Sequence, residues 1–546
     1  MKNNNSSTLP AKSISQRLDA FFGAIPGSYL ITGVIILLVG LGIHNRFIQD
    51  DAFISFRYAK NFVDGHGLTW NVGDPEPVEG YTNFLWTMLM ALGIALKIDP
   101  VLGSMVLGLT CGVSTLIFTY FTSLKTTQSQ SLAVIATLLL GTNYTFSSYM
   151  TGGLETQLQA FLTIVSVYLT LRILGQSRRN LLLLLSLTFA LAILNRLDAV
   201  LLCCILYVVV AIDAFKQPEK KIRNLIWLTF PAFLILITWF LMKYAYYGDI
   251  LPNTFYVKAG SSSSLERGLI YTSQFFVRYG IILFVLIGLI YVNKIRTQFP
   301  FAVVLASLKI TWICYVIKVS GGFMEFRLFV PIMPLLFIQI ALILFFFKDW
   351  MKVFSVICMV SLSLYHAKTF EGGHKIESIS QLHAHIVDEK ENWQAVGRVL
   401  GELFGEADKP VVISTTAAGA IPFYSQLPTI DMLGLNDKWI AKNGMVIGSR
   451  PGHTRFATIE YLLESKVDLV IGHPLVRKRS SPPTNWMTSF FWGAHDLTQL
   501  PITSRIVEIP INAGYRIDVL YISDNACVDQ LIKEHGFITQ PLPIGR

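Results

Sequence analysis

The stretch RFIQDDAFISFRYAKNFVDGHGLTWNVGDPEPVEGYTNFLW, residues 46–86, gathers acids, bases and aromatic side chains between hydrophobic segments that contain almost none. Two adjacent carboxylates, Asp50 and Asp51, follow the first apolar run within about two helical turns. Arg57 and Tyr58 come next at helical spacing, and a segment punctuated by Gly and Pro completes the stretch. A polar stretch of this kind between apolar runs predicts an active site.

The composition around this stretch is that of a membrane protein. Of 546 residues, 53% are hydrophobic and only 14% are charged, and the mean hydropathy is +0.52, which is too apolar for an ordinary soluble domain. The net charge of +9 does not indicate nucleic acid as a partner, because the basic residues cluster in short loops between apolar segments, as the positive-inside rule expects. The sequence therefore predicts a polytopic α-helical protein of the lipid bilayer.

Loop charges assign a side to each predicted membrane span. Spans of roughly 16 to 24 residues fall near residues 28–44, 101–122, 130–150, 154–173, 180–195, 199–216, 223–243, 269–292, 299–318, 328–347 and 351–367. If the basic loops are cytoplasmic, the alternate loops face outward, and these contain TGGLETQ, NRLDA, YGDILPNTFYVKAG and GGFMEFR. The apolar segment 83–98 breaks this parity if it crosses, so we interpret it as re-entrant, interfacial or broken, which leaves about 11 crossings.

Three regions follow from this reading. Residues 1–27 form a cytoplasmic leader, and residues 28–367 form a transmembrane catalytic domain in which residues 44–86 are the first outer loop. Residues 368–546 have the composition of a soluble domain outside the cytoplasm. Helical periodicity in NWQAVGRVLGELF and short β-rich runs in PVVIST, RIVEIP and YRIDVLYIS predict an α/β arrangement there.

The adjacent carboxylates are the predicted catalytic groups. Side chains of neighbouring helical residues project about 100° apart, so Asp50 and Asp51 are better suited to divided roles, a general base and an orienting group, than to holding one ion together. Two like charges side by side also raise one pKa, which helps a base. The alternative is that the two residues only satisfy helix ends, where Asp is a favoured cap.

Outward-facing cations are the predicted contacts of an anionic headgroup, because guanidinium suits phosphate oxygens. Buried ion pairs are the alternative for two of them, Arg196 with Asp198 and Arg327 with Glu325. The candidates for binding the phosphate of a donor are Arg57, Arg196, Lys258 and Arg327.

Polar and aromatic residues of the outward loops are predicted to bind a sugar or an acceptor, although aromatic residues also belong to the interfacial belt of any membrane protein. These candidates are Tyr58, Trp70, Asn71, Glu79, Tyr81, Asn83, Glu155, Asn195, Asp198, Asn253, Tyr256, Glu325, Asp431, Asn436 and Asp437. The last three lie in IDMLGLND, which either caps a helix or reaches the membrane site. The sequence requires no cofactor, and a divalent cation has only the weak candidates His383, His385 and Asp388.

The motifs DDAFISFRYAKNFVDGHGLTWN, VEGYTNFLW, TGGLET, NRLD and IDMLGLND resemble those of the GT-C superfamily of integral-membrane glycosyltransferases, and more closely those of mycobacterial and corynebacterial terminal arabinofuranosyltransferases and their bacterial relatives. This resemblance covers most of the chain. It implies a polyprenyl-monophosphate-sugar donor, inversion at the anomeric carbon, an active site on the periplasmic side of the bacterial inner membrane, and an aspartate base that falls on Asp50 or Asp51.

The function expected from this resemblance is transfer of a sugar, with arabinofuranose as one candidate, to a periplasmic glycan, glycolipid or protein. Within the same superfamily, a mannosyl or aminoarabinosyl transferase and a glycan polymerase or ligase are alternatives. A flippase for lipid-linked sugars is the non-enzymatic alternative, and it would place polar clusters on two gated faces instead of one.

Overall fold

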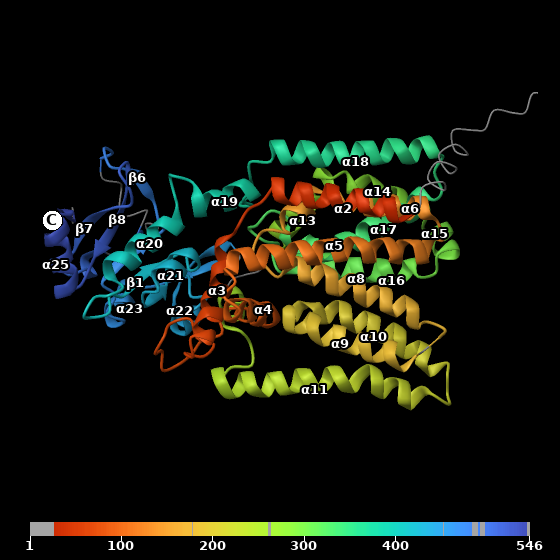
Figure 1. Ribbon diagram of the computed structural model, residues 1–546, viewed down its shortest axis with the longest axis horizontal. Coiled ribbons are helices and arrows are strands. Elements are labelled where there is room, and N and C mark those ends of the chain that lie inside the picture. Colours follow the sequence, from red (N-terminus) through yellow and green to blue (C-terminus); the bar gives the residue numbers. More distant parts are fainter. Residues whose placement is uncertain are drawn as a thin grey trace, which may run out of the picture.

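The computed structural model describes residues 27–176, 178–259, 264–450, 452–482, 490–491 and 497–542, so the predicted leader lies outside the described residues up to residue 26. Figure 1 shows an elongated molecule, with long helices running side by side over most of its length and a domain that contains the β-strands at one end. The chain enters this domain after α18, the helix Asp349–Thr369.

The bundle helices begin and end close to the predicted spans, because each apolar run is bounded by polar or capping residues. They are α2 (Gly27–His44), α5 (Pro100–Thr127), α6 (Gln130–Gly141), α7 (Tyr144–Ser148), α8 (Thr156–Ile173), α9 (Arg179–Asn195), η1 (Leu197–Ala199), α10 (Val200–Phe215), α11 (Lys221–Tyr247), α13 (Leu265–Arg278), α14 (Ile281–Ile290), α15 (Val292–Gln298), α16 (Ala302–Lys318), η2 (Arg327–Ile332), α17 (Met333–Leu344) and α18. The predicted span 269–292 is instead two helices, α13 and α14, bent by 89°.

Within the described residues, five helices are long and apolar enough to cross a membrane alone, and six if the bent pair counts as one span. The predicted count of about 11 includes shorter apolar helices and stays a prediction. Burial separates the centre of the bundle from its edge. In the most apolar 18 residues of the segment Arg327–Leu344, 83% are buried, whereas in those of α11 only 6% are buried. A helix that is apolar and exposed, as α11 is, suits contact with lipid.

The segment that broke the predicted parity forms only a short helix. α4 (Phe84–Ala95) has 12 residues and is therefore about 18 Å long, which is less than the roughly 30 Å of a bilayer core. Figure 1 shows α4 and α3 (Asp50–Val63) together at the end of the bundle that adjoins the C-terminal domain. The interpretation of residues 83–98 as re-entrant, interfacial or broken stays a prediction.

The C-terminal domain is built on a seven-stranded sheet with the order β2-β1-β5-β8-β7-β9, in which β6 also pairs with β8. β1 is parallel to β2 and β5, and the remaining pairs of this sheet are antiparallel. The described elements are α19 (Ile379–Val387), α20 (Trp393–Phe404), β1 (Ile413–Thr415), α21 (Ala420–Ser425), β2 (Thr429–Asp431), α22 (Lys438–Asn443), β3 (Met445–Arg450), β4 (His453–Phe456), α23 (Ile459–Glu464), β5 (Leu469–Gly472), β6 (Val476–Lys478), η3 (Leu497–Gln499), β7 (Arg505–Pro510), β8 (Tyr515–Tyr521), α25 (Ala526–His535) and β9 (Ile538–Pro541). The mixed α/β prediction is confirmed.

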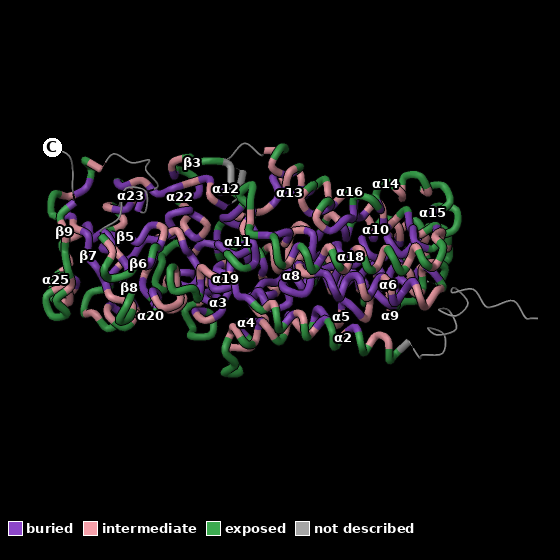
Figure 2. Tube along the Cα trace, turned by 90° about the horizontal axis from the view of Figure 1, so that it is seen from above, coloured by how far each residue is buried: buried purple, intermediate pink, exposed green. Residues whose placement is uncertain are grey.

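The domain is joined to the bundle through α3. Aromatic rings of α3 pack against rings of α21. The ring centroid of Phe53 lies 5.5 Å from that of Phe423 and 5.4 Å from that of Tyr424, and the ring centroid of Phe56 lies 6.1 Å from that of Phe423. Figure 2 shows α3 among mostly buried segments at this junction. The segment predicted to be the first outer loop is therefore part of an interdomain core, a role that its sequence alone did not reveal.

Candidate functional site

A cavity of about 490 Å³ lies between the end of the bundle and the C-terminal domain. Residues far apart in the sequence meet around it. The bundle side contributes Gln49, Asp50, Asp51, Ile54, Ser55, Gly80, Tyr81, Thr82, Asn83, Leu154, Glu155, Arg196, Thr254, Tyr315, Val319, Gly321, Gly322, Phe323, Met324, Arg327 and Leu328. Members of all four predicted outward clusters thus share one cavity with the two aspartates.

Asp50 is bonded to the C-terminal domain. It lies in the first turn of α3, and its Oδ1 accepts a hydrogen bond from the backbone N–H of Ala420 at 2.7 Å, while Oδ2 accepts one from Gly419 at 3.1 Å. Burial raises the pKa of Asp50 to about 7, against the opposite effect of these two amides. A Cβ at Gly419 would lie 1.9 Å from the carbonyl oxygen of Asp50, so this close approach requires glycine. Asp50 therefore satisfies a helix end, that of α21.

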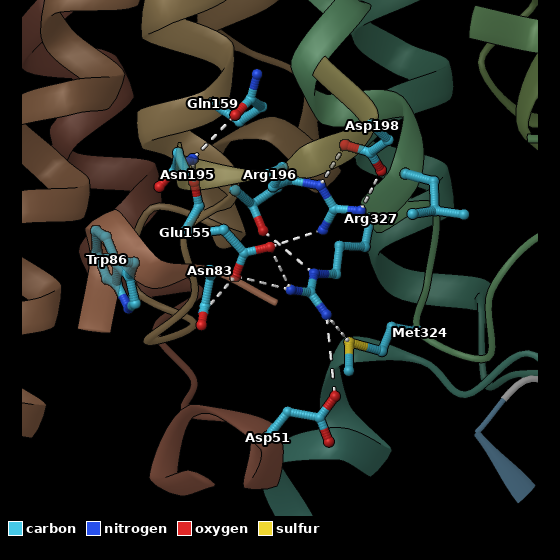
Figure 3. A network of polar contacts seen from close by, with 12 residues as sticks. Asp51, Asn83, Trp86, Glu155, Gln159, Asn195, Arg196, Asp198, Met324 and Arg327 are labelled. Atoms are coloured by element: carbon cyan, nitrogen blue, oxygen red, sulfur yellow. Dashed lines mark hydrogen bonds and ion pairs between the residues drawn. The ribbon is translucent and has the colours of Figure 1, made fainter. Parts of the chain in front are cut away.

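Asp51 takes a different direction on the same helix turn. Its backbone N–H donates to the side chain of Gln49 at 2.6 Å, which caps α3. The Asp51 side chain is 35% exposed, and its Oδ2 lies 4.0 Å from Nη1 of Arg327. Figure 3 shows the carboxylate pointing toward Arg327. The two neighbouring acids are thus separated by their environments, one buried at the domain interface and one more exposed beside a guanidinium.

Glu155 is the centre of the polar network under the cavity (Figure 3). Its carboxylate is 1% exposed and accepts hydrogen bonds from Arg327 Nη2 at 2.8 and 3.0 Å and from Arg196 Nη1 at 2.7 Å. Asn83 Nδ2 donates to the same carboxylate at 3.1 Å. A buried carboxylate is tolerated only when it is paired and hydrogen-bonded in this way, so Glu155 fixes both arginines at the cavity wall.

Both alternative ion pairs can now be judged. Arg196 does pair with Asp198, through Nε at 3.0 Å and Nη2 at 2.5 Å. The pairing of Arg327 with Glu325 is wrong, because Glu325 is turned away to His366 Nε2 at 2.9 Å and to the backbone N–H of Ile379 at 2.9 Å. Arg327 pairs with Glu155 instead.

Arg57 lies outside the cavity lining and binds backbone. Its Nε donates to the carbonyl of Trp70 at 2.6 Å, its Nη1 to the carbonyl of Pro422, and its Nη2 to that of Leu427 at 2.9 Å and to Asn71 at 3.1 Å. The guanidinium also lies 4.9 Å from the Trp70 ring centroid. These contacts tie α3 to α21 and to the loop that follows it, so the geometry assigns Arg57 to domain docking.

Several predicted sugar-binding residues make further interdomain contacts. Asn71 exchanges two hydrogen bonds with the backbone of Thr429, at 2.8 and 3.1 Å. The Tyr58 hydroxyl donates to the carbonyl of Val78 at 2.6 Å and lies 3.3 Å from Asn436 Oδ1. Asn436 is held by Asp431, which accepts from its backbone and side chain at 2.9 and 3.0 Å.

The loop IDMLGLND therefore does reach the bundle, through backbone carbonyls and the Asn436 side chain. Asp437 caps α22 by accepting from Ile440 at 2.8 Å, and Asn253 Nδ2 donates to the carbonyls of Gly434 and Leu435 at 2.8 and 3.1 Å. From this loop, Leu433 and Leu435 line the cavity.

The remaining candidates lie around the cavity or behind its wall. Tyr81 and Asn83 line it, whereas Glu79 forms a buried pair with Lys243 at 2.6 Å. Asn195 donates to Gln159 at 3.0 Å beneath Glu155. The Tyr256 hydroxyl donates to Asp249 at 3.2 Å, away from the cavity lining. The side chain of Lys258 lies outside the described residues.

The C-terminal domain supplies an opposite wall that the sequence identified only in part. It consists of Glu377, Leu382, His385, Trp393, Thr416, Ala418, Leu433, Leu435, Gly452, His453 and His473. Two sequence signals fell in this wall: IDMLGLND, which contains Leu433 and Leu435, and HAH at residues 383–385, which the sequence suggested as a metal candidate. Among the described residues, no group of three or more His, Cys, Asp or Glu side chains is arranged to hold a metal ion.

His385 is fixed between two carboxylates. Its Nδ1 contacts Glu391 and its Nε2 lies 3.5 Å from Glu377, while its ring stacks on Trp393 with centroids 4.7 Å apart. Burial lowers the pKa of His385, but the two glutamates outweigh it and raise the pKa to about 9. The ring is therefore an imidazolium at neutral pH.

Comparison with known proteins places the fold. A family model described as "Domain of unknown function (DUF8728)" matches residues 381–516, and no curated protein matches the sequence. The chain is similar to ArnT from Cupriavidus metallidurans bound to undecaprenyl phosphate, with 12% identity, coverage of 91% of this chain and 98% of that chain, and a TM-score of 0.56. The apo state of ArnT from the same organism has 13% identity, coverage of 93% of this chain and 98% of that chain, and a TM-score of 0.54. An oligosaccharyltransferase of Archaeoglobus fulgidus has 12% identity, coverage of 89% of this chain and 72% of that chain, and a TM-score of 0.49. The chain therefore shares the fold of ArnT, and its helical bundle is followed by a C-terminal sheet domain, as the sequence predicted.

Proposed function

We propose that this protein is an inverting membrane glycosyltransferase that moves a sugar from a polyprenyl-monophosphate donor to an acceptor hydroxyl. One observation carries this proposal: the cavity places a partly exposed carboxylate, Asp51, beside a guanidinium, Arg327, that a buried carboxylate holds in position. A base and a fixed cation side by side are what attack by a hydroxyl and departure of a phosphate require.

Asp51 is the proposed base. Both oxygens of Asp50 accept backbone hydrogen bonds from the C-terminal domain, whereas Asp51 lines the cavity and is the more exposed of the pair. A pKa near 7 also suits a base, and the pKa of Asp50 is about 7. Single replacement of each aspartate therefore decides between them.

Arg327 is the proposed phosphate contact. Each nitrogen of the Arg196 guanidinium is bonded to a carboxylate, of Glu155 or Asp198. Arg327 differs, because its Nη1 contacts the Met324 sulfur at 3.4 Å and a thioether is a weak acceptor. Arg196 would then act on the phosphate only by holding Glu155 and Arg327 in place.

The proposed donor carrier and location agree with the fold. The ArnT structure of the same fold is bound to undecaprenyl phosphate, and a polyprenyl chain needs a site reached from the bilayer, as the exposed apolar helices offer. We propose that the chain lies in the bacterial inner membrane with the cavity and the C-terminal domain on the periplasmic side. The cavity wall that this domain supplies would then face a glycan, glycolipid or protein acceptor.

The test uses membranes that contain the full chain. Lipid that copurifies with the protein is identified by mass spectrometry, and sugar transfer from that lipid is compared between the wild type, Asp51→Asn and Asp50→Asn. We expect Asp51→Asn to lower the transfer rate at least 100-fold, within the usual range for loss of a base, and to leave lipid copurification intact. Full activity of both variants contradicts the assignment of a base to this pair.

A further inference from the structure

Arg327 lies between two carboxylates that hold it unequally (Figure 3). Its Nη2 donates to both oxygens of Glu155, at 2.8 and 3.0 Å, and its Nε to Thr156 Oγ1 at 3.3 Å. Its Nη1 lies 4.0 Å from Asp51 Oδ2, across the cavity edge. One arm of the guanidinium is thus anchored, while the other faces the cavity with a longer contact.

We propose that Arg327 hands its Nη1 contact over from Asp51 to the departing phosphate during sugar transfer. This inference rests on the proposed function and adds a coupling between the base and the leaving group. In the reaction, the acceptor hydroxyl gives its proton to Asp51 as its oxygen forms a bond to the anomeric carbon. The bond between that carbon and the phosphate oxygen breaks, and its electron pair stays on the phosphate.

The charges around Nη1 change in opposite directions during this step. Asp51 loses one negative charge when it is protonated, and the phosphate gains one when it departs. A cation within reach of both groups therefore has one negative charge beside it throughout the step, first on Asp51 and then on the phosphate. Its attraction to the phosphate strengthens only as the transition state is approached. An interaction that grows in the transition state accelerates the reaction, whereas one that is equal in the ground state does not.

Arg196 is not placed to make this exchange. Its Nη1 is 2.7 Å from Glu155, and its Nε and Nη2 are bonded to the two oxygens of Asp198, which the Tyr315 hydroxyl also contacts at 2.8 Å. Its contacts run away from Asp51. The hydrogen bonds of Arg327 Nη2 to Glu155 hold the guanidinium in place, so only Nη1 can change its partner.

The test measures binding of undecaprenyl phosphate to the purified full chain, with undecaprenol as the matched ligand without a phosphate. Asp51→Asn stands for the protonated base. We expect it to bind undecaprenyl phosphate about fivefold more tightly than the wild type, since removal of Asp51 releases Nη1. In an Arg327→Gln background the same replacement should give a gain of about twofold or less. Asp64→Asn, on the exposed pair with Lys60, is the control and should bind as the wild type does.

Direct repulsion between Asp51 and the phosphate would give a different pattern. It needs no arginine, so the gain from Asp51→Asn would stay as large, or grow, in the Arg327→Gln background, and this result would overturn the hand-over. Arg327→Lys is the second background, because a single ammonium cannot hold Glu155 and also occupy the position of Nη1; the gain should be lost there too. Wild-type protein that binds undecaprenyl phosphate no better than undecaprenol would contradict the proposed function itself.

Discussion

The carboxylate of Asp50 accepts hydrogen bonds from the backbone N–H groups of Gly419 and Ala420, more than 360 residues later in the chain. This contact joins the first turn of α3 to the start of α21 and so joins the bundle to the C-terminal domain. Because Asp51 is the next residue, the position of the proposed base depends on how that domain is docked.

Replacement of Asp50 by Ala should loosen this docking. Two buried N–H groups lose their acceptor, which costs about 1–3 kcal/mol each when no water replaces it. We expect faster amide hydrogen exchange at residues 419–431, with unchanged exchange in β7 and β8 on the far side of the domain. The same protection in Asp50→Ala as in the wild type would show that the contact does not hold the domain.

Arg57→Lys should produce a similar loosening at the other end of α21. A lysine can bond one of the carbonyls that Arg57 now reaches at Trp70, Pro422 and Leu427, but not the three together. The expected result is faster exchange at residues 422–429 and a free energy of unfolding lower by about 1–3 kcal/mol. Lys60→Met, on the exposed face of the same helix, is the matched control and should change neither quantity.

Glu155→Gln should destabilise the bundle end strongly. It leaves two partly buried guanidiniums, Arg196 and Arg327, without their shared carboxylate, and the loss of one partner of a buried ion pair costs about 3–5 kcal/mol. Thermal unfolding of the purified protein measures this loss. Because the double variant Glu155→Gln/Arg327→Gln removes one charge of each sign, it should recover part of the stability, and an additive further loss would contradict the network as described.

The pair of glutamates around His385 predicts a dependence of stability on pH. The pKa of His385 is about 9 in the folded protein, above its ordinary value of 6.5, so the folded state binds this proton more tightly. The stabilisation is fully present below about pH 6.5 and is lost as the pH rises through about 9. At pH 6 the free energy of unfolding of the wild type should be higher than that of His385→Gln by on the order of 2 kcal/mol. This difference should shrink toward pH 9.5. Melting curves of both proteins across this range give the measurement; a constant difference would argue against the charged ring.

The sequence by itself determined the membrane class, the approximate helix bounds and the convergence of distant clusters. Long apolar runs specify helices because no other structure satisfies the backbone in lipid, and the spacing of basic loops places the polar clusters at one end. The adjacent acids Asp50 and Asp51 were recognised from type and position alone. The bend between α13 and α14 was not predicted. It occurs at Gly280, which has a positive φ, after an amphipathic helix that ends in Arg278.

The division of roles within the first outer loop was decided only by the tertiary structure. Arg57, Tyr58 and Asn71 looked like ligand-binding groups, yet each has a partner in the C-terminal domain. Arg57 and Asn71 donate to backbone carbonyls of Leu427 and Thr429, and Tyr58 contacts the side chain of Asn436. A hydrogen-bonding side chain does not reveal its partner from sequence, because a phosphate oxygen and a carbonyl oxygen satisfy the same donor. Packing of the two domains determines which acceptor is within reach, and it left Asp51 and Arg327 facing the cavity while it turned Asp50 and Arg57 into the interface.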